Sequence, residues 1–256
     1  MRIPFPVAPL SAPRGPRRTS GPRAARGLAV ALAVGALALL APRATRAQVA
    51  VVDEGSFTIV RGGATIGREE FRIMRQPAGG ASEYVARALA AYGERRIAPA
   101  LQTDASGLPL RYQVEVRSGR TVELRLTGQL TRAHFSTQTQ TGSSEAARTY
   151  LVGDTTVVVD DELFHQYFFL ALHRKPGGEA RVPVLVPRRN LHGPMRVQEA
   201  GADRLTLGTR TLDATRLEVT EPGGRARTVW VDAAGRVLRV ASPSEGLVAQ
   251  RDDPPR

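Results

Sequence analysis

The feature that most constrains the fold is a two-residue alternation of apolar and polar side chains, repeated along the chain and interrupted by glycine-rich turns. In one clear example, Val122, Leu124 and Leu126 alternate with Glu123 and Arg125. Successive residues of a strand point to opposite faces, so this pattern indicates a sheet with one buried and one solvated face. A chain built mostly from such segments must become a sandwich or a sheet that curls on itself.

The number of these segments predicts a mainly β protein, with a curved antiparallel sheet or open half-barrel of about a dozen strands and one covering helix. A first hairpin has Gly62 and Gly63 at its turn, where positive φ is needed. The polar segment 138–150 is predicted to be a connection. The segment "VPVLVP" (182–187) is apolar on both faces, which favours a position under other elements.

The first 47 residues predict a signal peptide. They contain eight Arg and no acidic residue, and residues 27–41 form an apolar run of 15. The run is shorter than the roughly 20 residues of a membrane-spanning helix. Small residues at Thr45 and Ala47 suit cleavage after Ala47. We therefore expect a single periplasmic or secreted β domain over 48–256, with a disordered tail at 252–256. The paired arginines at 17–18 leave both the general and the twin-arginine export route open.

Charge and composition exclude several classes of protein. The formal net charge of the whole chain is +12. Without the eight arginines of the predicted signal peptide, the chain has 28 basic and 24 acidic residues. No dense basic patch is interleaved with aromatic residues, which argues against nucleic acid as a partner. The absence of Cys excludes disulfides and thiolate metal sites. An aromatic content of 5% argues against a cleft in which sugar rings stack. No later apolar run approaches membrane length, so the mature chain is not expected to span a membrane.

The segment 157–178 concentrates aromatic and ionisable residues and predicts a helix at about 160–174. Asp160 suits the N-cap, and Pro176 with the following glycines suits the end. Its broad apolar face would pack on the sheet. An alternative uses Asp161 and His165, which lie four residues apart on one helical face, as two ligands of a metal ion. A third ligand would have to come from elsewhere in the chain.

Other candidates for chemistry are few. Glu69 and Glu70 are adjacent on a predicted strand and point to opposite faces, so they cannot form a catalytic pair. The alternative that one of them is a buried carboxylate facing a cavity stays open. No nucleophile elbow or phosphate-binding loop occurs. We predict no cofactor and no catalytic residue, and we favour a non-enzymatic role.

Three segments carry a resemblance to known proteins: "GSFTIVRGGATIGREEFRI" (55–73), "DDELFHQYFFLAL" (160–172) and "TVWVDAAGRVLRVASPSEGLVAQRD" (228–252). Together they resemble families of uncharacterised exported bacterial β-proteins over most of residues 53–251. More remotely, such proteins are similar to the periplasmic lipoprotein-carrier fold, an open β-barrel with a helical lid over an apolar cavity. The resemblance implies binding of a lipid. The carriers contain more helix than this sequence predicts.

These observations lead to three functional hypotheses. The first is a periplasmic protein that holds a lipid or other apolar ligand in an open β-barrel, with a pocket lined by Phe164, Tyr167, Phe168, Val184 and Trp230. The alternative is a structural or protein-interaction module of the cell envelope with no ligand cavity, whose partner is another envelope protein. The third hypothesis is a metal-dependent enzyme.

Overall fold

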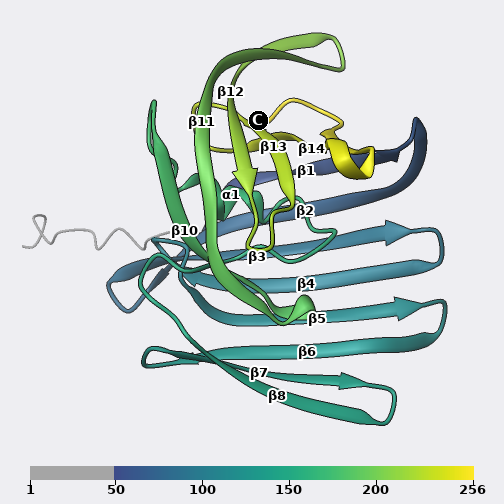
Figure 1. Ribbon diagram of the computed structural model, residues 1–256, viewed down its shortest axis with the longest axis vertical. Helices are drawn as coiled ribbons and strands as arrows, with labels where there is room; N and C mark the ends of the chain where they lie inside the picture. The colour runs from purple at the N-terminus through teal and green to yellow at the C-terminus, as the bar shows by residue number, and fades with distance from the viewer. Residues whose placement is uncertain (1–48) are drawn as a thin grey trace, which may run out of the picture. The chain divides into compact units, whose positions relative to one another are not determined.

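The computed structural model describes residues 49–256, which form one open antiparallel sheet of 15 strands (Figure 1). The predicted signal peptide lies outside the described residues. The sheet order is β8-β7-β6-β5-β4-β3-β2-β1-β15-β14-β13-β12-β11-β10-β9. The first and last strands therefore pair in the middle of the sheet, and the middle of the chain forms both edges. The prediction of a mainly β protein with a curved open sheet is confirmed, although the strands number 15 and not about a dozen.

In chain order the strands are β1 (Ala50–Arg61), β2 (Ala64–Ala78), β3 (Ala81–Tyr92), β4 (Arg95–Asp104), β5 (Pro109–Ser118), β6 (Thr121–Thr131), β7 (His134–Thr141), β8 (Ser144–Leu151), β9 (Val157–Val158), β10 (Glu179–Val186), β11 (Leu191–Leu207), β12 (Arg210–Thr220), β13 (Ala226–Val231), β14 (Val237–Ser242) and β15 (Leu247–Arg251). The helical elements are α1 (Tyr167–Ala171), η2 (Pro187–Arg189) and η3 (Pro243–Glu245). Neighbouring strands are antiparallel except β9 and β10, which are parallel.

Tight glycine turns set the register of the first half of the sheet. Gly62 and Gly63 have φ angles of 57° and 85°, as the β1–β2 turn requires. The meander then continues with short turns to β8. Where β1 and β15 meet, Arg251 donates two hydrogen bonds to the buried carboxylate of Asp53, at 2.8 and 3.0 Å. This buried ion pair joins the two ends of the described chain.

The chain leaves the sheet between β9 and β10, because these neighbouring strands are parallel and need a long return connection. Residues 159–173 of this connection lie on the inner face of the sheet, and we call them the plug. Phe164 lies 6.4 Å from Phe57 of β1, and Phe168 lies 5.7 Å from Tyr84 of β3, between ring centroids. The plug therefore supplies the centre of the main hydrophobic core.

The helix in the plug is much shorter than predicted. Only Tyr167–Ala171 are α-helical, in place of 160–174. Asp160 does not cap the helix, because its carboxylate is taken by Tyr112 and Arg188. The residue at the N-cap position is Gln166, and its side-chain oxygen accepts a hydrogen bond from the backbone N–H of Asp160 at 2.6 Å. Tertiary contacts therefore override the capping pattern.

A second, smaller core lies on the opposite face of the sheet. The β11–β12 hairpin contributes Leu205 and Leu207, which pack with Leu238 of β14 and with Trp230 of β13. Trp230 was predicted to line the same pocket as the plug aromatics, and this is wrong. Its neighbours Val229 and Val231 belong to the main core instead, because adjacent strand residues point to opposite faces.

Two further predictions need correction. Residues 138–150, predicted to be a polar connection, form the second half of β7 and most of β8. The tail at 252–256, predicted to be disordered, is attached to the sheet. The carboxylate of Asp252 accepts hydrogen bonds from the hydroxyls of Ser56 and Thr58, both at 2.6 Å. The Asp252 backbone N–H also donates to the Ser56 carbonyl at 2.9 Å. By contrast, the burial of the "VPVLVP" segment is confirmed, since Val184 and Leu185 of β10 are both fully buried.

Candidate functional site

The interior of the curved sheet is filled by the plug. Phe164, Tyr167, Phe168 and Val184, which were predicted to line a ligand pocket, are all buried with at most 2% of their surface exposed. A side chain that lines a water-sized cavity would expose surface to it. These four residues therefore meet in the core and pack against protein atoms, which leaves no room beside them for an acyl chain while the plug is in place.

One carboxylate of the pair at 69 and 70 is buried, but it faces the plug and not a cavity. Glu69 of β2 is fully buried, whereas its neighbour Glu70 is exposed on the other face. One oxygen of Glu69 accepts a hydrogen bond from the backbone N–H of Phe164 at 2.7 Å, and the other contacts Nδ1 of His165. The His165 ring stacks on Phe71, with 5.9 Å between centroids. Glu69 is thus a structural anchor.

A second buried group anchors the start of the plug. The Asp160 carboxylate accepts hydrogen bonds from the Tyr112 hydroxyl at 2.7 Å and from Nε of Arg188 at 2.8 Å. Burial raises the pKa of Asp160, and the adjacent Arg188 guanidinium opposes that rise. Burial also raises the pKa of the Tyr112 hydroxyl well above its ordinary value. Tyr112 therefore remains a neutral donor to Asp160.

Acidic residues of the plug pair with arginines from distant parts of the chain. Glu162 lies 2.6 Å from Arg95, and Asp161 lies 3.2 Å from Arg225. Asp161 and His165, the two candidate metal ligands, therefore take different partners and do not form a ligand set. Within residues 49–256, no group of three or more His, Asp or Glu side chains is arranged to hold a metal ion.

The plug also contains unfavourable features. Glu162 has a φ of 62°, in the left-handed region that non-glycine residues rarely adopt. Three of its buried side-chain nitrogens have no hydrogen-bond partner among the described residues: Nε2 of His165, Gln166 and His173. Unpaired buried polar atoms of this kind each cost about 1–3 kcal/mol. Strain and unpaired polar groups concentrate in segments whose conformation has a function.

The two edges of the sheet differ sharply. At one edge β9 is two residues long, and both residues are fully buried. At the other edge β8 is eight residues long and pairs with β7 without a register shift. Seven of its residues are exposed, and Leu151 is 67% exposed. The end of β8 contacts the β10–β11 connection, where the Tyr150 hydroxyl donates to Oδ1 of Asn190 at 2.8 Å. Residues 144–149 of β8 therefore present a regular strand with one side of its backbone unpaired.

This edge is the site that the sequence did not predict. The strand "SEAARTYL" has no apolar alternation, because neither face of β8 is covered. The only available signals were the β-compatible residues at 148–151 and the glycine turn at 142.

Comparisons with known proteins give no family. No protein-family model matches the chain, and neither a curated protein nor a solved structure matches it. In the part of the chain that the structure describes, no helix has the length and apolar character needed to span a bilayer. The class defined by the fold is therefore an open antiparallel β-sheet protein whose interior is plugged by its own chain.

Proposed function

We propose that this protein is a non-enzymatic binding module of the cell envelope, which adds an extended segment of a partner protein to its edge strand β8. The observation that carries the proposal is the long, regular and unpaired edge of β8. Native sheets protect such edges with short strands, proline or bulges, because an open edge is a template for another strand. Strand addition is a common way for a sheet to recognise an extended peptide.

The protection of the opposite edge supports the proposal. There β9 is short and buried, so that edge offers no comparable template. On β8 the exposed charges are only Glu145 and Arg148, which have opposite signs and leave the edge nearly neutral. The packed interior further supports recognition at an edge over binding within the sheet.

The experiment is site-specific photo-crosslinking of the full chain in cells that export it, with the crosslinker at Ala147. The same crosslinker at Asp213 of β12, which is 94% exposed, is the matched control. We expect one discrete protein adduct from Ala147 and none from Asp213. Ala146→Pro and Ala147→Pro then test the pairing, because the N–H groups of adjacent residues in an edge strand point to opposite sides.

One of the two prolines removes an N–H that faces away from β7. That variant should keep its fold and lose the adduct from a crosslinker moved to Thr149. The other proline should destabilise the β7–β8 pairing. An adduct that persists in both variants, or that forms equally from Asp213, would contradict strand addition.

A second candidate function, holding an apolar ligand, is favoured by the strained and unsatisfied plug. The left-handed backbone at Glu162 and the unpaired buried nitrogens make the plug costly to keep inside the sheet. Such a segment is suited to leave the interior, where an acyl chain could replace its aromatic side chains. Native mass spectrometry of residues 48–256, purified without detergent, would show a lipid as extra mass that organic extraction removes. Arg188→Ala should weaken the plug anchor and increase binding of a fluorescent fatty acid, while Arg210→Ala on exposed β12 should not. A bare polypeptide mass together with no binding by either variant would exclude this function.

A further inference from the structure

The outer face of strands β4 to β8 carries two ordered rows of hydrogen-bonding side chains. Register places five of them as successive cross-strand partners in the first row: Gln102, Arg111, Gln129, Ser136 and Thr149. The second row has three such partners between Ala100 and Ala147: Gln113, Thr127 and Gln138. All but Gln102 are exposed. The first row spans roughly 19 Å, because neighbouring strands lie about 4.8 Å apart.

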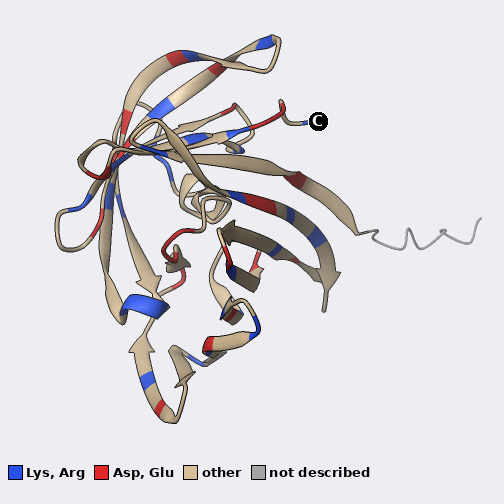
Figure 2. Cartoon of the chain, turned by 90° about the vertical axis from the view of Figure 1, so that its right-hand side faces the viewer, with Lys and Arg blue, Asp and Glu red and all other residues tan. Residues whose placement is uncertain are grey.

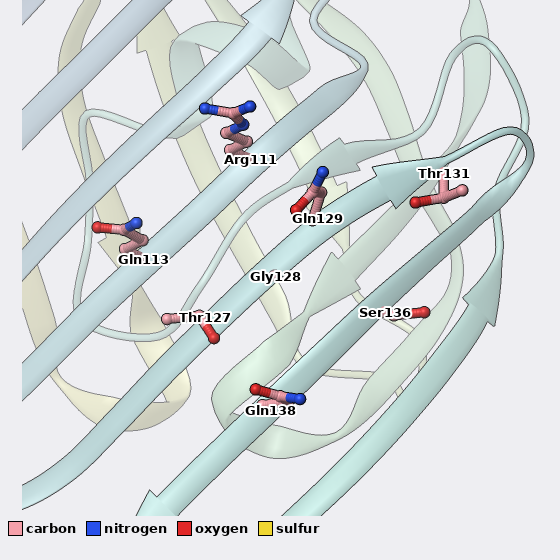
Figure 3. A pocket seen from close by; sticks show the side chains of 8 residues that line it. All are labelled: Arg111, Gln113, Thr127, Gly128, Gln129, Thr131, Ser136 and Gln138. Carbon is pink, nitrogen blue, oxygen red and sulfur yellow. The ribbon is translucent and has the colours of Figure 1, made fainter. Parts of the chain in front are cut away.

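The rows lie in a hollow of the surface. Figure 3 shows the first part of this hollow, lined by side chains of β5, β6 and β7, with a volume of about 460 Å³. A second hollow of about 480 Å³ adjoins it toward β8 and shares Thr127 and Gln138 with it. The surface that the two rows define is therefore recessed and continuous across four strands. We call it the polar hollow.

The side chains of the polar hollow have unused hydrogen-bonding capacity. Within residues 49–256, Gln113, Gln129 and Gln138 make no side-chain hydrogen bond, although each amide supplies donors and an acceptor. Arg111 has no acidic partner among the described residues, whereas Arg125 nearby lies 2.9 Å from Glu115. The hollow thus offers neutral donors and acceptors and the uncompensated positive charge of Arg111, while the exposed carboxylate of Glu145 lines its end at β8.

We propose that the polar hollow binds a linear glycan that carries carboxylate groups. The spacing between strands is comparable to the length of one sugar ring in a linear chain, so successive sugars can meet successive side chains of a row. Amide and hydroxyl side chains match sugar hydroxyls, and Arg111 matches a uronate carboxylate through a charge-assisted hydrogen bond. No aromatic side chain lines the hollow, so recognition is by hydrogen bonds and not by stacking.

The charge pattern disfavours a polyanion recognised by charge alone. Figure 2 shows basic and acidic residues interspersed along the strands. Nucleic-acid sites need many phosphate contacts from Lys and Arg, and the hollow offers one free arginine. This inference uses side chains on the outer face of β5 to β8, whereas strand addition uses the backbone edge of β8.

The test is isothermal titration of the protein with three probes: a hexamer of galacturonate, the neutral hexamer cellohexaose, and a short polyglutamate of equal charge. We expect the galacturonate hexamer to bind and polyglutamate not to bind. Cellohexaose should bind more weakly, because it lacks the partner of Arg111. Binding of polyglutamate as strong as that of the galacturonate hexamer, or no binding of the galacturonate hexamer, would overturn the proposal.

Three variants locate the site. Arg111→Gln should weaken galacturonate binding by about tenfold, because a lost charge-assisted hydrogen bond is typically worth about 1.4 kcal/mol or more. Gln113→Ala with Gln129→Ala should weaken binding of both hexamers. Arg210→Gln, an exposed arginine on β12 in the other half of the sheet, is the matched control and should bind as the parent does. These side chains are exposed, so circular dichroism should be unchanged. An equal loss in the Arg210→Gln variant would refute the assignment to the polar hollow.

Discussion

The anchoring role of Glu69 gives the sharpest test of how the plug is held. Glu69→Ala removes the acceptor for two buried groups, the Phe164 backbone N–H and Nδ1 of His165. Each donor left unpaired in the core costs about 1–3 kcal/mol. We therefore expect the free energy of unfolding to fall by about 2–6 kcal/mol. For a domain of this size, such a loss lowers Tm by roughly 4–24 °C.

The neighbouring residue provides a matched control. Glu70 has the same side chain on the same strand but is exposed, and its contact with Arg68 at 3.4 Å is a surface ion pair. Glu70→Ala should change stability by at most about 0.5 kcal/mol. Glu69→Gln should recover part of the loss, because its amide oxygen still accepts the Phe164 N–H. Thermal and urea unfolding, followed by circular dichroism, measure all three variants. Equal effects of the substitutions at 69 and 70 would refute the anchoring argument.

Three further predictions concern the sheet and its polar groups. Arg251→Ala leaves the Asp53 carboxylate buried and unpaired, so urea unfolding should show a loss of about 3–5 kcal/mol; a loss under 1 kcal/mol would mean that solvent reaches Asp53. Gly128→Ala places a Cβ 2.5 Å from the Phe135 ring, so it should lower Tm, and an unchanged Tm would show that the ring moves freely. Burial lowers the pKa of His173, so its neutral form is favoured in the fold. The stability that neutral His173 contributes is therefore fully present above the ordinary His pKa of about 6.5, and it is lost as pH falls through the lowered pKa. Replacing His173 with Gln should reduce the loss of stability between pH 7 and pH 5, and an unchanged pH profile would contradict this.

The sequence by itself determined the fold class and much of the sheet. Alternation identified strands wherever one face is buried, as in β6 and β12, and the glycine pairs located turns such as the one at Gly62. The opposite orientations of Glu69 and Glu70 followed from strand geometry alone. The aromatic segment was correctly predicted to pack in the interior. These features depend on local geometry and on burial, which leave a pattern along the chain.

Only the tertiary structure decided where the ends of the sheet lie, what the plug does and which edge is open. Alternation is absent from β8 because neither face of that strand is covered, so no burial pattern marks it. The helix was predicted too long because Asp160 suits an N-cap in isolation, whereas Tyr112 and Arg188 claim its carboxylate in the fold. Trp230 was placed in the wrong core because a strand buried on both faces gives no sign of which face each residue joins. Pairing between residues distant in the chain, such as β1 with β15, decides these features, and one sequence does not encode that pairing locally.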